Sequence, residues 1–177
     1  NKYMIAQFED VTDEEDIDMI DVISRTGTPR FTSNGSGEDW VTLADFCKTK
    51  DLNDPENLQY VLDRLDVDSL FTHAAYEIIL GNTDFTNVRL YRVPGGKWKW
   101  ILYDMDYGLY NYSANGIGNY LNPKGHGAND DIDNSLILKL LENTDMLDRF
   151  LTRFGEIFQF FTTERMLAQI EECYAIL

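Results

Sequence analysis

The chain has 177 residues, of which 44% are hydrophobic and 13% aromatic, a composition typical of a folded globular protein with a single domain over residues 1–177. Its 31 acidic residues outnumber 15 Lys and Arg and give a net charge of −16, which argues against nucleic acid or an anionic membrane surface as the partner. The sequence also lacks a run of about 18 apolar residues that could span a bilayer.

The first forty residues contain an acidic segment followed by a segment rich in Gly, Ser and Thr. Residues 13–23 place Ile17, Ile20 and Ile23 at helical spacing, which predicts an acidic helix with one apolar face. The aspartates do not fit a calcium-binding EF-hand loop, because the glycine required at its sixth position is missing. Residues 26–37 are predicted to form a loop.

Three helices are predicted in the next part of the chain, at residues 40–48, from Pro55, and at residues 68–80. Asp54 can cap the second helix, with Pro55 at its first position, and Asp68 is expected to cap the third. Gly81 follows the third helix where a left-handed C-cap is expected. His73 lies within this apolar helix and is predicted to be a core or surface residue.

A β-hairpin is predicted after this helix. Residues 88–93 and 97–103 are rich in Val, Ile, Tyr and Trp, and Pro-Gly-Gly separates them. A hairpin brings its two ends together. Asp84 and Asn87 stand before the first strand, and Asp104 and Asp106 follow the second, so these four side chains are expected to be neighbours.

The last seventy residues are predicted to be a long connection followed by helices. Residues 107–133 are rich in Gly and Asn and lack a period, so they predict a functional or mobile loop, in which Lys124 and His126 are candidate substrate contacts with ordinary loop residues as the favoured interpretation. Helices are then expected near residues 136–141, over 145–161 and from Thr163, with apolar stripes that form core. The inward residues expected on the last helix are Met166, Leu167, Ile170, Tyr174 and Leu177.

The two cysteines, Cys47 and Cys173, lie far apart and do not have metal-ligand spacing. They are predicted to be buried free thiols, with a single disulfide as the alternative.

The acidic residues at the hairpin ends predict a metal site. Three carboxylates in one small site repel one another unless a cation offsets their charge. Magnesium and manganese prefer carboxylate and amide oxygens, which Asp84, Asn87, Asp104 and Asp106 supply. Zinc is disfavoured because a nearby pair of Cys or His residues is missing.

The order of these motifs is also that of a protein kinase, in which a catalytic Asp and a metal-binding Asn precede an Asp-Phe-Gly motif. Residues 81–109, GNTDFTNVRLYRVPGGKWKWILYDMDYGL, resemble the core of the CotH (spore coat protein H) kinase family. Residues 55–177 as a whole resemble that family's C-terminal portion. The resemblance implies an α+β, mainly helical fold, in which a kinase-like C-terminal lobe carries the metal site on a β-hairpin.

The resemblance also implies an activity and a role for each residue. Members of the family are taken to use ATP and magnesium to phosphorylate serine in secreted or spore-coat proteins, which implies an extracellular or spore-surface location. Asp84 matches the Asp that accepts the hydroxyl proton, and Asn87 and Asp106 match the metal ligands. Asp104 stands beside Asp106 in the family's Asp-x-Asp pair and would be a direct or supporting ligand.

Two departures and two alternatives remain. The spacing between Asp84 and Asn87 is shorter than in the usual family pattern, and the nucleotide-gripping N-terminal lobe is not recognisable. The first residue is Asn1 rather than Met, and the chain is therefore expected to be the C-terminal lobe of a larger kinase that needs its own N-terminal lobe. A calcium-stabilised, non-catalytic scaffold is the alternative. A glycoside hydrolase is disfavoured because Gly108 stands where the acid of an Asp-x-Asp-x-Glu site would be.

Overall fold

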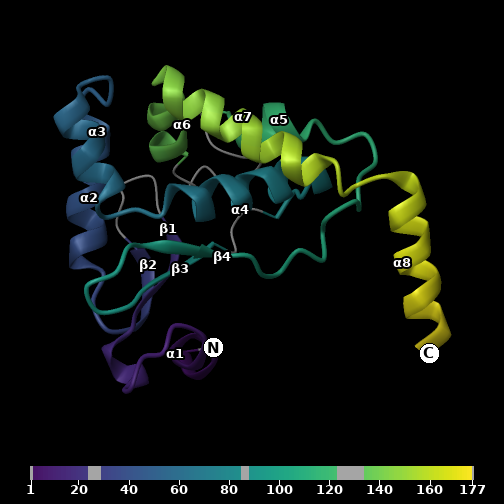
Figure 1. The fold of residues 1–177 in the computed structure, drawn as a ribbon, viewed down its shortest axis with the longest axis horizontal. Helices are drawn as coiled ribbons and strands as arrows, with labels where there is room; N and C mark the ends of the chain where they lie inside the picture. The colour runs from purple at the N-terminus through teal and green to yellow at the C-terminus, as the bar shows by residue number, and fades with distance from the viewer. Residues whose placement is uncertain (1, 24–28, 85–87, 123–133, 177) are drawn as a thin grey trace.

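A central helix, α4, lies between a small antiparallel sheet and a layer of helices in the computed structural model (Figure 1). The structure describes residues 2–23, 29–84, 88–122 and 134–176. The strands are β1 (Asp18–Ile23), β2 (Pro29–Asn34), β3 (Arg89–Arg92) and β4 (Lys99–Ile101), in the sheet order β2-β1-β3-β4. The helices are α1 (Lys2–Phe8), the 3-10 turn η1 (Glu14–Asp16), α2 (Glu38–Thr49), α3 (Pro55–Leu62), α4 (Val67–Leu80), α5 (Gly116–Tyr120), α6 (Ser135–Leu141), α7 (Thr144–Phe158) and α8 (Thr163–Ile176). Mainly helical with one small sheet, this is the predicted α+β class.

The predicted helix at residues 68–80 is confirmed as α4, with one change at its start. The side chain of Asp66, not Asp68, accepts a hydrogen bond from the backbone N–H of Ser69 at 3.0 Å and caps the helix. Gly81 ends it in the left-handed conformation at φ 57°, where a residue without Cβ is favoured. The predicted helices at 40–48 and from Pro55, capped by Asp54, are likewise confirmed as α2 and α3.

The main core lies around α4. Trp40 of α2 meets Trp98 and Trp100 edge to face, with ring centroids 5.8 and 5.6 Å apart. On the other side of α4, Phe71 meets Phe150 of α7 at 5.3 Å. Large buried aromatic rings contribute much of the energy of a core, so the tryptophan contacts join α2 to the β3–β4 hairpin and the phenylalanine contact joins α4 to α7.

The acidic segment at residues 13–23 is not a helix, and that prediction was wrong. It forms η1 and then β1, which pairs with β2 on one side and β3 on the other. Asp18 lies opposite Arg92 and Asp21 opposite Arg89, and each pair is joined by an ion pair across the strands. These arginine partners neutralise the aspartates within the sheet. The segment 26–37, predicted as a loop, contains strand β2.

Three predictions for the last third of the chain also need correction. The long connection contains α5 at Gly116–Tyr120, while Lys124 and His126 lie outside the described residues. The predicted helix at 145–161 ends at Phe158, where that side chain is exposed. The two cysteines are free, but Cys173 is exposed rather than buried, whereas Cys47 is buried as predicted.

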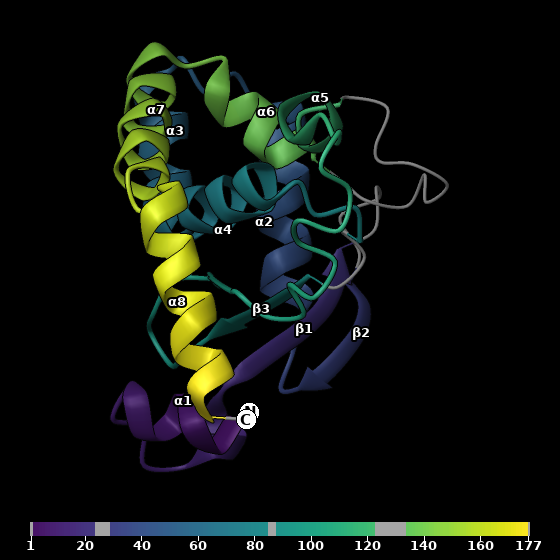
Figure 2. The same ribbon diagram turned by 90° about the vertical axis from the view of Figure 1, so that its right-hand side faces the viewer.

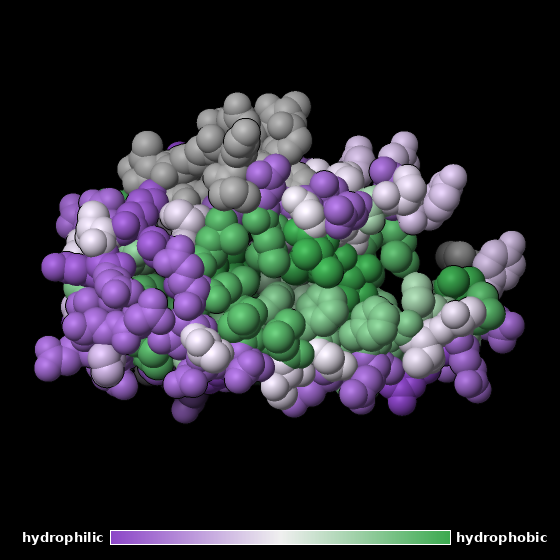
Figure 3. Space-filling view, turned by 90° about the horizontal axis from the view of Figure 1, so that it is seen from above, coloured by the Kyte–Doolittle hydropathy of each residue, from purple (hydrophilic) through white to green (hydrophobic). Residues whose placement is uncertain are grey.

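The last helix, α8, leaves the helical layer at the end of α7 (Figure 2). It was predicted to turn apolar residues inward, but it has no fully buried residue, and Leu167, Ile170 and Tyr174 are exposed. Seen from above, the molecule carries a broad apolar area bordered by hydrophilic residues (Figure 3). Within the described ranges, no helix combines the length and apolar character needed to cross a membrane.

Candidate functional site

The loop that carries Asp84 begins where α4 ends. Gly81 turns the chain, and the next residue, Asn82, is buried with 1% of its surface exposed. Its side-chain oxygen accepts a hydrogen bond from the backbone N–H of Asp84 at 3.0 Å. An asparagine that accepts from the amide two residues later forms a local turn, and this turn fixes the backbone at the half-buried Asp84.

The segment after β4 returns to the same place. Strands β3 and β4 pair antiparallel, as predicted for the hairpin. The backbone N–H of Leu109 donates to the carbonyl oxygen of Leu80 at 2.6 Å. Gly108 packs so closely that an added Cβ would lie 3.2 Å from the Cβ of Leu80. The end of the Asp104–Leu109 segment therefore packs directly against the end of α4, next to the Asp84 loop.

Electrostatics link the two ends of the hairpin as well. Burial raises the pKa of Tyr103, the nearby Arg89 lowers it, and the charges of Asp21, Asp104 and Asp84 raise it further. Arg89 lies 5.0 Å from the centre of the Tyr103 ring. Because both Asp84 and Asp104 act on one hydroxyl, the two carboxylates lie within electrostatic reach of the same point.

The four predicted site residues are placed as follows. Asp84 is half-buried, whereas Asp104 and Asp106 are exposed. Asn87 lies outside the described residues. Asp104 has a left-handed backbone at φ 57°, a conformation that Asp tolerates better than most residues. Over the described ranges, three or more His, Cys, Asp or Glu side chains do not gather into a group that could hold a metal ion.

A buried titratable cluster stands behind the Asp84 loop, and the sequence analysis did not assign it a role. Glu77 and His73 lie one turn apart on α4 and are 3% and 2% exposed. Nε2 of His73 is 3.4 Å from Oε1 of Glu77, and its Nδ1 is 3.4 Å from the hydroxyl of Tyr120 on α5. A carboxylate and an imidazole among the apolar residues of a predicted core helix were the signal that could have found this cluster.

Burial dominates the protonation of this cluster. It raises the pKa of Glu77 to about 7, a rise that a hydrogen bond from the Asn82 side chain opposes and the charge of Asp84 increases. Burial also lowers the pKa of His73 to about 4. Within the described structure, Oε2 of Glu77 and Nε2 of His73 have no hydrogen-bond partner. Buried polar atoms without partners cost stability and are concentrated at functional sites.

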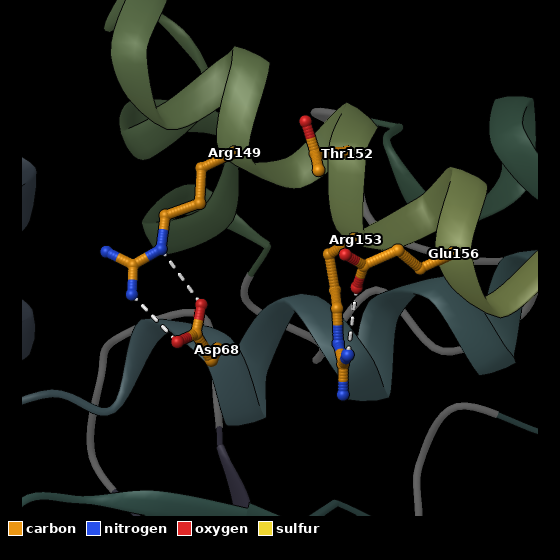
Figure 4. Close-up of a pocket in the computed structure, with 5 residues that line it drawn as sticks. All are labelled: Asp68, Arg149, Thr152, Arg153 and Glu156. Carbon is orange, nitrogen blue, oxygen red and sulfur yellow. Dashed lines mark hydrogen bonds and ion pairs between the residues drawn. The ribbon is translucent and has the colours of Figure 1, made fainter.

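A second polar region lies at the opposite end of α4, in a pocket between α4 and α7 (Figure 4). Arg149 donates two hydrogen bonds, at 2.9 and 2.8 Å, to the carboxylate of Asp68. Arg153 donates to the hydroxyl of Thr72 at 2.9 Å and pairs with Glu156 at 3.1 Å. The charged groups drawn in this pocket are already paired with one another.

Comparison with known proteins gives one match. A family model described as CotH kinase protein matches residues 23–177, which cover β2, the β3–β4 hairpin and every helix from α2 onward, whereas β1 is included only at its last residue, Ile23. Nothing matched among curated proteins or among solved structures.

Proposed function

This chain belongs to the CotH kinase family, and from that premise we propose that it takes part in transferring the γ-phosphoryl group of ATP to serine in protein substrates. The observation that carries the proposal is the packing of the Asp104–Leu109 segment against Leu80 at the end of α4, the residue after which the chain turns into the loop that carries Asp84. In kinases the loops that hold the catalytic Asp and the metal-binding Asp must meet in the same way.

Asp84 is proposed as the proton acceptor. Its backbone is fixed by Asn82, and its carboxylate is half-buried at the mouth of the site. The serine oxygen attacks the γ-phosphorus, the bond to the β-phosphate oxygen breaks to release ADP, and the hydroxyl proton passes to the Asp84 carboxylate. A positioned general base of this kind contributes about 10²–10⁴-fold to a rate.

Asp104, Asp106 and Asn87 are proposed to hold Mg²⁺ or Mn²⁺ together with the phosphates of ATP. Their donor atoms are the oxygens that these cations select. Magnesium is usually bound by one or two carboxylates plus substrate phosphates, not by a full protein cage. Two exposed carboxylates beside the Asp84 loop fit that requirement. When bound, the ion neutralises charge on the transferred phosphoryl group.

The remaining parts of the reaction are proposed from the family alone. An N-terminal lobe of the same protein is proposed to bind the nucleotide. The acceptor is proposed to be a secreted or coat protein, and the site of action the cell or spore surface. The acidic surface, with a net charge of −16, favours a basic acceptor segment.

The test is phosphate transfer from labelled ATP to a serine-containing protein with Mg²⁺ or Mn²⁺ present, using the protein together with its proposed N-terminal lobe. We expect Asp84→Asn to lower kcat about 10²–10⁴-fold while nucleotide binding, measured by calorimetry, is retained. Asp106→Ala is expected to abolish metal-dependent nucleotide binding. Asp68→Asn, which removes an exposed carboxylate at the far end of α4, is the matched control and should leave both measurements unchanged. Full activity in Asp84→Asn would refute the assignment.

A further inference from the structure

Asn82 touches both loops of the proposed active site. Its Oδ1 accepts the hydrogen bond from the N–H of Asp84. Its Nδ2 lies 3.5 Å from the carbonyl oxygen of Asp84 and 3.9 Å from the sulfur of Met105. Met105 stands between the two proposed metal ligands Asp104 and Asp106. The buried side chain of Asn82 therefore connects the Asp84 loop to residues 104–106, here called the metal loop.

Asn82 is itself held from the side of α4. Its backbone N–H donates to the carbonyl oxygen of Glu77 at 3.1 Å, and its side chain is near enough to the Glu77 carboxyl to oppose the rise in the pKa of that group. Glu77 in turn lies next to His73 on the same helix, with Oε1 of Glu77 3.4 Å from Nε2 of His73. Asn82 therefore contacts three parts of the structure. Its backbone binds α4, and its side chain contacts the backbone of Asp84 and the sulfur of Met105.

A simple end cap for α4 would not need this arrangement. The turn at Asp84 uses Oδ1 alone, and a serine hydroxyl can form the same kind of turn. The Nδ2 group adds contacts that a cap does not require, and it is accompanied by a buried carboxyl with one unpartnered oxygen in the described structure. Burying a carboxyl costs stability unless it is paired, so capping of α4 alone does not account for this arrangement.

We propose that Asn82 is a positioning residue that holds the Asp84 loop and the Asp104–Asp106 loop at a fixed separation, with its own backbone anchored to α4 at the Glu77 carbonyl oxygen. The expected effect of Asn82 on catalysis rests on the kinase function proposed above. Its structural content, the restraint of the Asp84 backbone and the metal loop, does not depend on that function.

The experiment compares Asn82→Ala with Asn82→Ser and uses Asn143→Ala as a matched control. Asn143 is a half-buried asparagine that caps α7 and donates to the carbonyl oxygen of Leu52 at 3.1 Å, away from the site. Amide hydrogen exchange at Asp84 is measured by NMR and corrected for the change in global stability. We expect exchange at Asp84 to rise at least tenfold in Asn82→Ala and to keep its wild-type rate in Asn143→Ala and Asn82→Ser.

Activity separates positioning from capping. Both Asn82 variants should lower kcat, by about 10–100-fold, because a misplacement of about 1 Å can cost 10²-fold, whereas KM for ATP should change less than kcat. Asn143→Ala should keep the wild-type kcat. Wild-type kcat in Asn82→Ser would overturn the proposal, since it would show that the turn alone suffices. If the wild-type protein transfers no phosphate, the proposed function fails, but amide hydrogen exchange still tests the positioning role of Asn82. Equal exchange rates at Asp84 in Asn82→Ala and Asn143→Ala would overturn that role.

Discussion

The two ends of α4 carry polar clusters of opposite character. At its N-terminal end, Asp68 and Arg149 form a bidentate ion pair that is 57% and 43% exposed. At its C-terminal end, Glu77 and His73 are almost completely buried, and each keeps a polar atom without a hydrogen-bond partner in the described structure. Exposed, paired charges are inexpensive and contribute little, whereas buried polar groups with missing partners are costly.

This difference indicates where the molecule has accepted a cost for function. The two clusters share one helix, along which Asp68 and Glu77 are separated by about 14 Å at 1.5 Å per residue. The pocket at the N-terminal end is the more obvious cavity, but its charges satisfy one another (Figure 4). The C-terminal cluster leads directly into Asn82 and Asp84. A perturbed buried group next to a loop is better evidence for a site than a cavity is.

The largest stability effect should come from titrating Glu77. Its pKa is raised to about 7 from 4.5, so the folded state holds a proton that the unfolded state has lost between these pH values. This contribution to stability is present at low pH and is lost as the pH rises from about 4.5 to about 7. Glu77→Gln removes the effect and should become more stable than wild type across that window, by about 2–3 kcal/mol at pH 7.5.

The measurement is urea unfolding of both proteins at several pH values, because the difference between the two curves cancels the titration of groups that do not interact with Glu77. His73 acts in the opposite direction, since its pKa of about 4 means that its contribution is lost as the pH falls from 6.5 to 4. Wild-type stability alone would therefore hide both effects between about pH 4.5 and 6.5. Glu156→Gln makes the same change at the exposed end. If the difference in the free energy of unfolding between Glu77→Gln and wild type did not change with pH, the two ends of α4 would not differ in the cost of their charges.

A packing change of intermediate size tests why the C-terminal end of α4 is buried. Gly116 begins α5, and a Cβ added there would overlap the carbonyl oxygen of Ile78 on α4. Gly116→Ala should therefore push α5 away and destabilise the protein by about 2 kcal/mol, the typical cost of overpacking. Gly155→Ala is the matched control, because a Cβ on that glycine of α7 meets no atom within 4 Å. Equal thermal unfolding midpoints for the two variants would contradict the close packing of α5.

The local parts of this architecture were predictable and the long-range parts were not. The apolar period of α4, the Gly81 cap and the hairpin turn are signals carried by neighbouring residues, and each is confirmed. Strand β1 was predicted as a helix because Asp18 and Asp21 look like a solvated face until their partners are known. Those partners, Arg92 and Arg89, are about seventy residues away in the chain, and sequence periodicity contains no information on such pairings.

The candidate site divides in the same way. Asp84, Asp104 and Asp106 could be proposed as site residues from the sequence because acidic residues flank a recognisable hairpin. Asn82 and Glu77 were not assigned roles, since their importance depends on burial under α5 and on contact with Met105. A helix pattern shows that Glu77 interrupts an apolar face, but it does not show whether the carboxyl reaches solvent. Only the packing of non-adjacent elements decides that question.

The smallest effect is expected at the exposed end of α4. Asp68→Asn removes the carboxylate that Arg149 grips with two hydrogen bonds. Despite this geometry, both side chains face water, so the loss should be less than about 1 kcal/mol and smaller still at high salt. Urea unfolding at low and high salt measures both quantities. A loss above about 2 kcal/mol would mean that the pair behaves as a buried one, and the two ends of α4 would then no longer differ in the cost of their charges.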